Sequence, residues 1–377
     1  MRTADMPVIK LAGSGRARGR QYGEALRRQI GDLVPRWEAQ VDGGSPAKAL
    51  IDDILKETRF DRAIQRWAPH LWEEVQGIAE GSGQPLWKIQ GIQLLDEIWW
   101  FTLYRKAGKA PWREHAEIPE RCSALGQVRG PKATYSGQNM DIGTWIEGHQ
   151  VLLHLEETEA APAQLVFTYA GSIALNGLNA RGIGYCCNTL IQLDPSATGL
   201  PMAYVGRRVL EQKSFGDALG ILRGVEHASG QNYLLGAPGR LGSYECSGNH
   251  AIAWKGEHGA DGPLLHTNHP LASREGRIFT EMSGGAEAAK RALRSTTEGR
   301  YGGLKRCAAN GPLEIETIKD TLRTKSPEAP ISRTGETVGG NPIGYTVGCT
   351  IYEHKAEPVL HLAAGPPCST EFMDFRF

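Results

Sequence analysis

A change of hydrophobic pattern around Ala110 constrains the fold of this chain more than any other feature. Before it, apolar residues recur at helical spacing over Arg16 to Val41, Ala47 to Trp67 and Leu71 to Glu80. After it, short runs of strand-forming residues follow one another at hairpin spacing. Helices followed by closely spaced strands predict an α+β protein rather than a doubly wound parallel sheet.

The strand-rich region begins after a charged, proline-bounded connector, Pro111 to Arg121. We expect an antiparallel meander, with a turn at Asn179 to Gly182, and then helices and a closing strand pair. The expected meander strands are Val151 to Leu155, Leu165 to Ala170, Ile173 to Leu178 and Ile183 to Thr189. The expected later elements are helices over Met202 to Arg223, over Ala286 to Thr297 and after Pro312, and strands over Tyr345 to Tyr352 and Pro358 to Ala363.

Composition narrows the class of partner. Of 377 residues, 40% are hydrophobic and 22% are charged, which is an ordinary globular balance. Because 42 Lys and Arg offset 42 Asp and Glu, the formal net charge is zero. The chain therefore has no overall positive potential that would attract nucleic acid or an anionic membrane. The composition therefore predicts a small-molecule partner, no nucleic acid and no membrane. It does not fix the oligomeric state, and a homo-oligomer is compatible with it.

The cysteines and the N-terminus indicate the compartment. Seven cysteines without a C-x-x-C pair disfavour a disulfide framework or a structural zinc site. The first residues run into no apolar stretch of secretory length. We therefore expect a cytoplasmic protein with reduced thiols. The dinucleotide, phosphate-loop and serine-elbow motifs are absent, and His266-Thr267-Asn268-His269 alone is a weak metal motif, so no cofactor is expected.

The most informative segment runs from Cys122 to Asp141. Gly130-Pro131 marks a turn, so the segment predicts a hairpin that brings Asp141 back beside Cys122. On residue types alone, the simpler interpretation is that Cys122 is an ordinary packed thiol and that Asp141 caps a turn.

A family resemblance changes that interpretation. The hairpin, with Ser136-Gly137-Gln138-Asn139-Met140-Asp141, resembles the nucleophile hairpin of the acyl-coenzyme A:6-aminopenicillanate acyltransferase family, the peptidase C45 group. Further similar segments lie in the same order along the chain. They are Gly13-Ser14 with Gly19 and Gly23, the helix Glu73 to Gly81, Leu178 to Gly184, and His266 to His269.

The resemblance implies an N-terminal-nucleophile hydrolase, a four-layer αββα sandwich with a helical N-terminal segment. It implies self-cleavage between Arg121 and Cys122, which gives an α chain of residues 1–121 and a β chain of residues 122–377 in one composite domain. It further implies that Cys122 is the nucleophile, that its α-amine is the base, and that Asp141 orients this amine. Asn268, and secondarily Asn188, would donate to the oxyanion.

Two positions depart from the family pattern. Arg121 precedes the nucleophile, where a fungal member has glycine, and Val347 stands before Gly348-Cys349-Thr350, where that member has arginine. Because Val347 offers no cation to a carboxylate, we predict that penicillins are poor substrates. The expected substrate is a small N-acyl amine or an acyl thioester, hydrolysed or used for acyl transfer.

Two alternatives stay open on the sequence alone. One is an unprocessed cysteine hydrolase that uses Cys122 with His266 or His269 as the base. The other is a catalytically silent protein that binds a small amide. An N-terminal sequence that begins at Cys122 would exclude the first of these.

Overall fold

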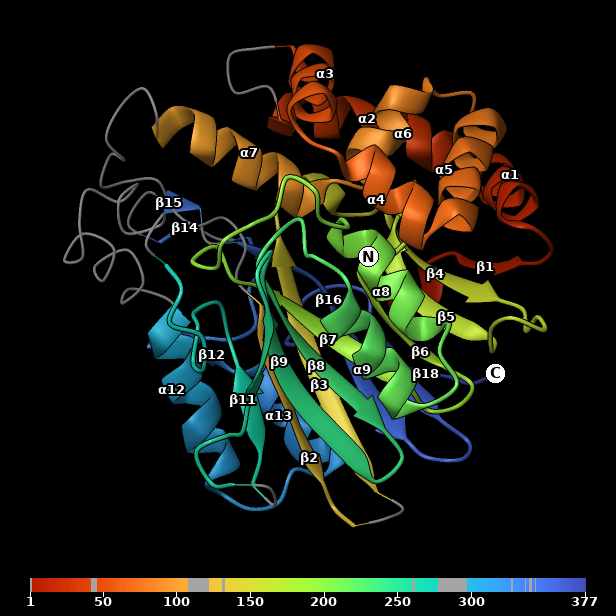
Figure 1. Ribbon diagram of the computed structural model, residues 1–377. Coiled ribbons are helices and arrows are strands. Elements are labelled where there is room, and N and C mark those ends of the chain that lie inside the picture. Colours follow the sequence, from red (N-terminus) through yellow and green to blue (C-terminus); the bar gives the residue numbers. More distant parts are fainter. Residues whose placement is uncertain are drawn as a thin grey trace.

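The structure is a computed structural model, and two sheets that face each other form its centre (Figure 1). It describes residues 2–41, 46–107, 122–130, 133–259, 262–276, 297–326, 328–335, 337–338, 341–342 and 344–377. The predicted connector, residue Arg121 and residues 286–296 of the helix predicted over Ala286 to Thr297 lie outside the described residues. None of the described helices is long and apolar enough to cross a membrane.

Within the described residues, the larger sheet has eight strands and the smaller has six. In spatial order, the larger sheet contains β1 (Val8–Leu11), β4 (Gln150–Leu155), β5 (Gln164–Tyr169), β6 (Asn176–Asn179), β7 (Gly184–Thr189), β8 (Gln231–Ala237), β9 (Arg240–Cys246) and β10 (Ala251–Trp254). The smaller sheet contains β11 (Leu264–His266), β2 (Ser123–Val128), β3 (Thr134–Ile142), β16 (Tyr345–His354), β17 (Val359–Ala363) and β18 (Met373–Phe375). Strand β1 pairs with β4 in parallel, and the other pairs are antiparallel.

Helices cover the outer face of each sheet. The larger sheet is covered by α8 (Met202–Leu210) and α9 (Phe215–Gly224), which lie in front of it in Figure 1. The smaller sheet is covered by α12 (Thr297–Ala308) and α13 (Ile315–Arg323). The order helix, sheet, sheet, helix confirms the predicted four-layer αββα sandwich.

The remaining elements are the N-terminal helices and short pieces. The N-terminal helices gather at one end of the sandwich (Figure 1). They are α1 (Gly15–Ala25), α2 (Arg27–Val41), α3 (Ala47–Glu57), α4 (Phe60–Trp67), α5 (Pro69–Ser82), α6 (Leu86–Ile92) and α7 (Leu95–Ala107). The short pieces are η1 (Thr3–Asp5), η2 (Thr144–Ile146), β12 (Lys325–Ser326), β13 (Ala329–Pro330), β14 (Thr337–Val338) and β15 (Asn341–Pro342).

Successive residues of β2 and β3 point into two different hydrophobic cores. Ala124 and Met140 belong to the core that includes the space between the sheets. Leu125 belongs to the second core, formed with α12 and α13 on the outer face of the smaller sheet. Because side chains alternate across a strand, each position of this hairpin is assigned to one side or the other.

Glycines allow helices α1 and α5 to cross at backbone contact. A Cβ on Gly19 would lie 1.9 Å from the carbonyl oxygen of Glu74, and one on Gly77 would lie 2.3 Å from that of Arg16. No side chain fits at such separations, because real Cβ contacts are never this short. The G-x-x-x-G spacing of Gly19 and Gly23 is therefore a helix-packing motif.

Most predicted elements are present, with additional breaks. The predicted helix over Arg16 to Val41 divides at Leu26, and the one over Met202 to Arg223 divides after Leu210. The predicted strand over Ile173 to Leu178 is wrong in its first half. Strand β6 begins at Asn176 because residues before it turn to place Ser172 and Ile173 against Tyr169 and Gln93.

Candidate active site

The nucleophile candidate lies in a small cavity at the start of β2. Cys122 directly precedes this strand and is 6% exposed. The space in it that a water-sized sphere can enter is about 30 Å³. It is lined by Leu95, Asp96, Cys122, Met140, Ile142, Leu175, Cys187, Thr189, Met202 and Gln231. Helices α7 and α8 and strands of both sheets thus meet at Cys122.

The β2–β3 pairing confirms the predicted hairpin. Ser123 is opposite Asn139, so the chain at Cys122 runs beside the end of β3. Met140 and Ile142 of β3 line the cavity with Cys122. The tight turn at Gly130, with a φ of 106°, is a conformation that favours glycine.

Arg300 of α12 joins Cys122 to Asn268. Its Nη1 donates to the backbone oxygen of Cys122 and, at 2.9 Å, to Ser123 Oγ. Its Nη2 donates to Asn268 Oδ1 at 2.8 Å. The arginine is fully buried, so one guanidinium holds both groups from inside the protein. Sequence reasoning missed this residue because no local pattern around it distinguishes it from other arginines.

Several hydrogen bonds hold Asn268 in place. Strand β11 pairs with β2, with His266 opposite Ala124, and this carries the following residues past Cys122. Asn268 Nδ2 donates to the backbone oxygen of Thr189 at 2.9 Å, and its backbone N–H donates to Thr297 Oγ1 at 2.8 Å. Since the amide nitrogen carries two hydrogens, one N–H remains for another acceptor.

Asn188 lies on β7 and is fully buried. Its Oδ1 accepts a hydrogen bond from Asn232 Nδ2 at 3.2 Å. Within the described part of the chain, the Asn188 amide nitrogen has no acceptor. Both predicted oxyanion donors are therefore buried asparagines with an N–H to offer, and their catalytic roles stay predictions.

Asp141 points away from the cavity. Met140 and Ile142, on either side of it in β3, belong to the core between the sheets, so its carboxylate faces the outer layer. There Oδ1 accepts from Thr346 Oγ1 at 2.6 Å, and Oδ2 lies 3.2 Å from Arg333 Nε. The prediction that Asp141 orients the α-amine of Cys122 stays a prediction.

The two histidines of the H-T-N-H motif have structural partners. Both ring nitrogens of His266 are engaged, Nδ1 with the Thr267 backbone oxygen at 2.8 Å and Nε2 with Glu245 Oε1 at 2.9 Å. His269 Nδ1 lies 3.0 Å from Thr297 Oγ1. Burial lowers the pKa of His269 to about 4. These contacts disfavour either imidazole as the base for Cys122.

Asp96 and Glu97 are adjacent buried carboxylates at the start of α7. Asp96 lines the cavity, whereas Glu97 accepts from the Met202 backbone N–H at 3.0 Å and from Ser229 Oγ at 2.8 Å. Burial, together with the neighbouring Asp96, raises the pKa of Glu97 to about 7. Sequence reasoning missed the pair, although two acids within an apolar run are an unusual signal.

The raised pKa of Glu97 predicts a pH-dependent stability. The folded protein holds this proton more strongly than the unfolded chain, whose glutamate has an ordinary pKa of 4.5. The free energy of unfolding contributed by Glu97 therefore falls as the pH rises from about 5 to about 7. We expect Glu97→Gln to lose less stability than wild type between pH 5 and 7.5 in thermal unfolding. Equal losses in the two proteins would contradict this origin.

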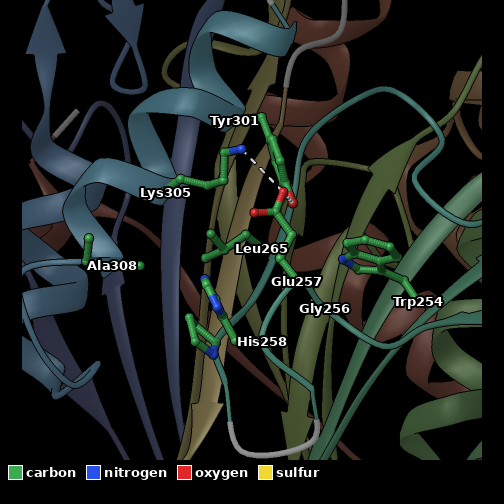
Figure 2. Close-up of a pocket in the computed structure, with 10 residues that line it drawn as sticks. Trp254, Gly256, Glu257, His258, Leu265, Tyr301, Lys305 and Ala308 are labelled. Carbon is green, nitrogen blue, oxygen red and sulfur yellow. Dashed lines mark hydrogen bonds and ion pairs between the residues drawn. The ribbon is translucent and has the colours of Figure 1, made fainter.

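A second hollow, lined in part by α12, shares no lining residue with the cavity. Figure 2 shows Tyr301 and Lys305 of α12 pointing toward Glu257, which accepts from Tyr301 Oη at 3.1 Å and from Lys305 Nζ at 3.3 Å. These contacts fasten α12 to the β10–β11 loop. They support the helix that carries Arg300, and we assign them no chemistry.

Comparison with known proteins supports the resemblance. A model of the family described as acyl-coenzyme A:6-aminopenicillanic acid acyl-transferase matches residues 128–299. The predicted family resemblance is confirmed. The match contains Asp141, Asn188 and Asn268 and begins after Cys122. It supports an enzyme that hydrolyses or transfers acyl groups.

Solved structures with similar folds are remote in sequence. An N-acylethanolamine-hydrolyzing acid amidase ortholog from Caenorhabditis elegans is 13% identical, with 61% of this chain and 92% of that chain covered and a TM-score of 0.39. Penicillin V acylase from Agrobacterium tumefaciens is 13% identical, with 64% and 83% covered and a TM-score of 0.44. A mutant of conjugated bile acid hydrolase from Clostridium perfringens is 11% identical, with 67% and 97% covered and a TM-score of 0.41. Among curated proteins, none matches the chain.

Proposed function

We propose that this protein is a self-processing cysteine amidohydrolase or acyltransferase that acts on small N-acyl amides through an acyl-enzyme on Cys122. The observation that supports this most is the junction of three residues. Cys122 lies in a cavity, and Arg300 binds both its backbone oxygen and the side chain of Asn268. Asn268 is thereby tied through one guanidinium to the backbone of Cys122 at the start of β2.

The proposed reaction proceeds in two steps. The Cys122 thiol loses its proton to a base, and the thiolate attacks the amide carbonyl carbon, forming a C–S bond. The C–N bond then breaks, and the amine leaves after it takes up that proton. Water or a second amine attacks the resulting thioester, which releases the acyl group and returns the proton to sulfur.

The proposed base is the α-amine of Cys122 after cleavage of the Arg121–Cys122 peptide bond. An α-amine has a pKa of about 7.7 to 8.0, so an appreciable fraction is neutral near pH 7.5. The engagement of both His266 nitrogens favours this base over the histidine alternative. The α chain of residues 1–121 and the β chain of residues 122–377 would remain together through the contacts of the N-terminal helices.

Negative charge on the carbonyl oxygen would be met by Asn268, with Asn188 as a second donor. In this proposal Asp141 positions the hairpin, because its carboxylate ties β3 to Thr346 and Arg333 from the outer face. No cofactor is required, since the nucleophile, base and oxyanion donor are all protein groups.

Replacement of Asn268 tests the proposal. With a panel of small N-acyl amines, wild type should release free amine, and Asn268→Ala should lower kcat by about 10²-fold to 10³-fold, because one oxyanion donor is removed. Amine release and melting temperature would be measured for both. Asn249→Ala, which removes an exposed asparagine bound to Glu275, is the control and should change kcat less than about twofold. Equal rates in Asn268→Ala and wild type would remove Asn268 from the mechanism.

A further inference from the structure

Asp96 brings a carboxylate from helix α7 into the wall of the nucleophile cavity. It is 1% exposed and lines the cavity together with Cys122. Its Oδ2 accepts from Thr189 Oγ1 at 3.0 Å and from Gln231 Nε2. Its Oδ1 is buried without a hydrogen-bond partner in the described part of the chain. One oxygen of this carboxylate is therefore fixed by the protein, and the other can accept from a further donor.

The charge of Asp96 is not balanced by the residues that the structure describes. Thr189 and Gln231 are neutral donors, and the adjacent Glu97 is a second acid. Among the described residues, Asp96 forms no ion pair with a lysine, arginine or histidine. Because a buried carboxylate without a counter-charge is costly, a cation next to Oδ1 would stabilise the site.

The size of the cavity restricts what this cation can be. The space that a water-sized sphere can enter is about 30 Å³. One water molecule occupies about 30 Å³ in the liquid, so an ammonium group fits and a longer chain does not. A water molecule would satisfy the hydrogen bond of Oδ1 but not the charge. A cation that belongs to the wall of the cavity would satisfy both, and the proposed cleavage creates one at Cys122.

Asp141, the acid that the family resemblance assigns to the α-amine of Cys122, is engaged on the other side of β3. Its carboxylate is held from the outer face of the smaller sheet. Asp96 lies instead on the side of Cys122 and is joined to the proposed oxyanion donor. Thr189, which donates to Asp96, accepts from Asn268 Nδ2 at 2.9 Å through its backbone oxygen.

We propose that the carboxylate of Asp96 holds the α-ammonium group that self-cleavage creates on Cys122. The inference rests on the proposed function and adds a positioning residue to its mechanism. When the α-amine takes the proton of the thiol, Asp96 balances the new positive charge through a charge-assisted hydrogen bond and takes no proton itself. The ammonium group then passes that proton to the leaving amine. Both chains thus contribute to the site, because Asp96 belongs to residues 1–121.

An NMR titration of protein labelled with 13C,15N-cysteine tests this contact without turnover. After cleavage, the nitrogen of Cys122 is the one cysteine nitrogen outside a peptide bond, so its signal is distinct. We expect the pKa of this amine to be at least about one pH unit lower in Asp96→Asn than in wild type, because the ammonium group loses its counter-charge. The rising limb of kcat/KM against pH should move to lower pH by the same amount.

The control variant is Glu97→Gln, which removes an adjacent buried acid that does not line the cavity. It should change the pKa of the amine by less than about half a pH unit. Besides these two acids, the titratable or charged side chains of the described residues that line or adjoin the cavity are the thiols of Cys122 and Cys187 and the guanidinium of Arg300. All three are the same in wild type and in both variants.

Asp141→Asn distinguishes the two candidate acids. If it lowers the pKa of the amine and Asp96→Asn does not, Asp141 holds the amine and the inference is overturned. If neither variant lowers it, the inference is overturned as well, and a water molecule accounts for Oδ1. Should Asp96→Asn not fold, wild type decides: its amine should have a pKa no lower than the ordinary range of about 7.7 to 8.0. A lower value, which burial without a counter-charge produces, would overturn the contact.

The same samples separate this inference from the proposed function. A wild-type chain that stays uncut has no α-amine at Cys122, which overturns the proposed self-processing and the inference with it. A cleaved wild type that hydrolyses N-acyl amides with the same pH profile as Asp96→Asn overturns the inference alone. A cleaved wild type whose amine responds to Asp96→Asn but which hydrolyses no amide upholds the contact and overturns the proposed function.

Discussion

Cys122→Ala should lower kcat for N-acyl amide hydrolysis by at least about 10³-fold while the melting temperature stays close to that of wild type. The reason is that the proposed acyl-enzyme cannot form without the sulfur, and removal of a nucleophile typically costs this much or more. The side chain lies at the edge of a cavity, so its truncation opens little new empty volume. Amine release from wild type and variant, measured at equal protein concentration, provides the comparison.

The same variant also tests the proposed cleavage of the backbone between Arg121 and Cys122. Wild type should separate on a denaturing gel into chains of residues 1–121 and 122–377, and N-terminal sequencing of the longer chain should begin at Cys122. Cys122→Ala should remain one chain of 377 residues. Cys122→Ser should be cleaved more slowly, because a hydroxyl is a poorer nucleophile than a thiolate.

The control for both readouts is Cys186→Ala. Cys186 is fully buried on β7, does not line the cavity, and burial raises the pKa of its thiol above the ordinary value. We expect this variant to be processed and to keep at least about half of the wild-type kcat. A wild-type protein that is fully active as one uncut chain would exclude the α-amine as base and return the histidines to consideration.

The nucleophile hairpin could be predicted because its information is local. A turn between two short runs sets the pairing of Ser123 with Asn139, and both lie within one segment of sequence. The side to which Asp141 points was harder to predict. It depends on which face of β3 is turned toward the second sheet, and that is decided by the packing of Met140 between the sheets.

The partners of Cys122 could not be predicted in the same way. Arg300 reaches it from a helix that is remote in sequence, and Asp96 reaches the cavity from α7. The local sequence pattern around Arg300 and Asp96 does not show that they lie near Cys122. Their proximity to it follows from the way the helices and sheets pack together. Only the resemblance drew attention to Asn268, and the structure adds the arginine that holds it.

The structure explains the glycines of α1 and the glutamates of α5, which the family resemblance singled out. Gly19 and Gly77 let α1 and α5 touch at the backbone, and this contact brings Glu74 of α5 between two arginines. Its carboxylate accepts from Arg207 Nη1 at 2.6 Å and from Arg18 Nη2 at 3.0 Å. Arg207 comes from α8, so this acid ties the N-terminal helices to the outer layer of the larger sheet.

Glu74→Ala should therefore lower the free energy of unfolding by about 3 to 5 kcal/mol, the usual cost of removing one partner from a buried ion pair. Glu74 and Arg207 are both fully buried, so the substitution leaves the Arg207 guanidinium without its counter-charge in a dry environment. Burial alone would raise the pKa of Glu74, yet Arg207 and Arg18 outweigh it and hold that pKa below its ordinary value. Urea denaturation of wild type and variant at pH 7.5 measures the difference.

The neighbouring residue supplies the control for this prediction. Glu73 is exposed, so Glu73→Ala should change the free energy of unfolding by less than about 0.5 kcal/mol. The double variant Glu74→Leu with Arg207→Met removes both charges and replaces them with apolar groups of similar size. It should be more stable than Glu74→Ala. The reason is that the loss of stability in Glu74→Ala comes mainly from burying an unpaired Arg207, whereas the native ion pair itself adds little net stability. If Glu74→Ala loses less than about 1 kcal/mol, the carboxylate does not join the helical segment to the sandwich in the way that these contacts indicate.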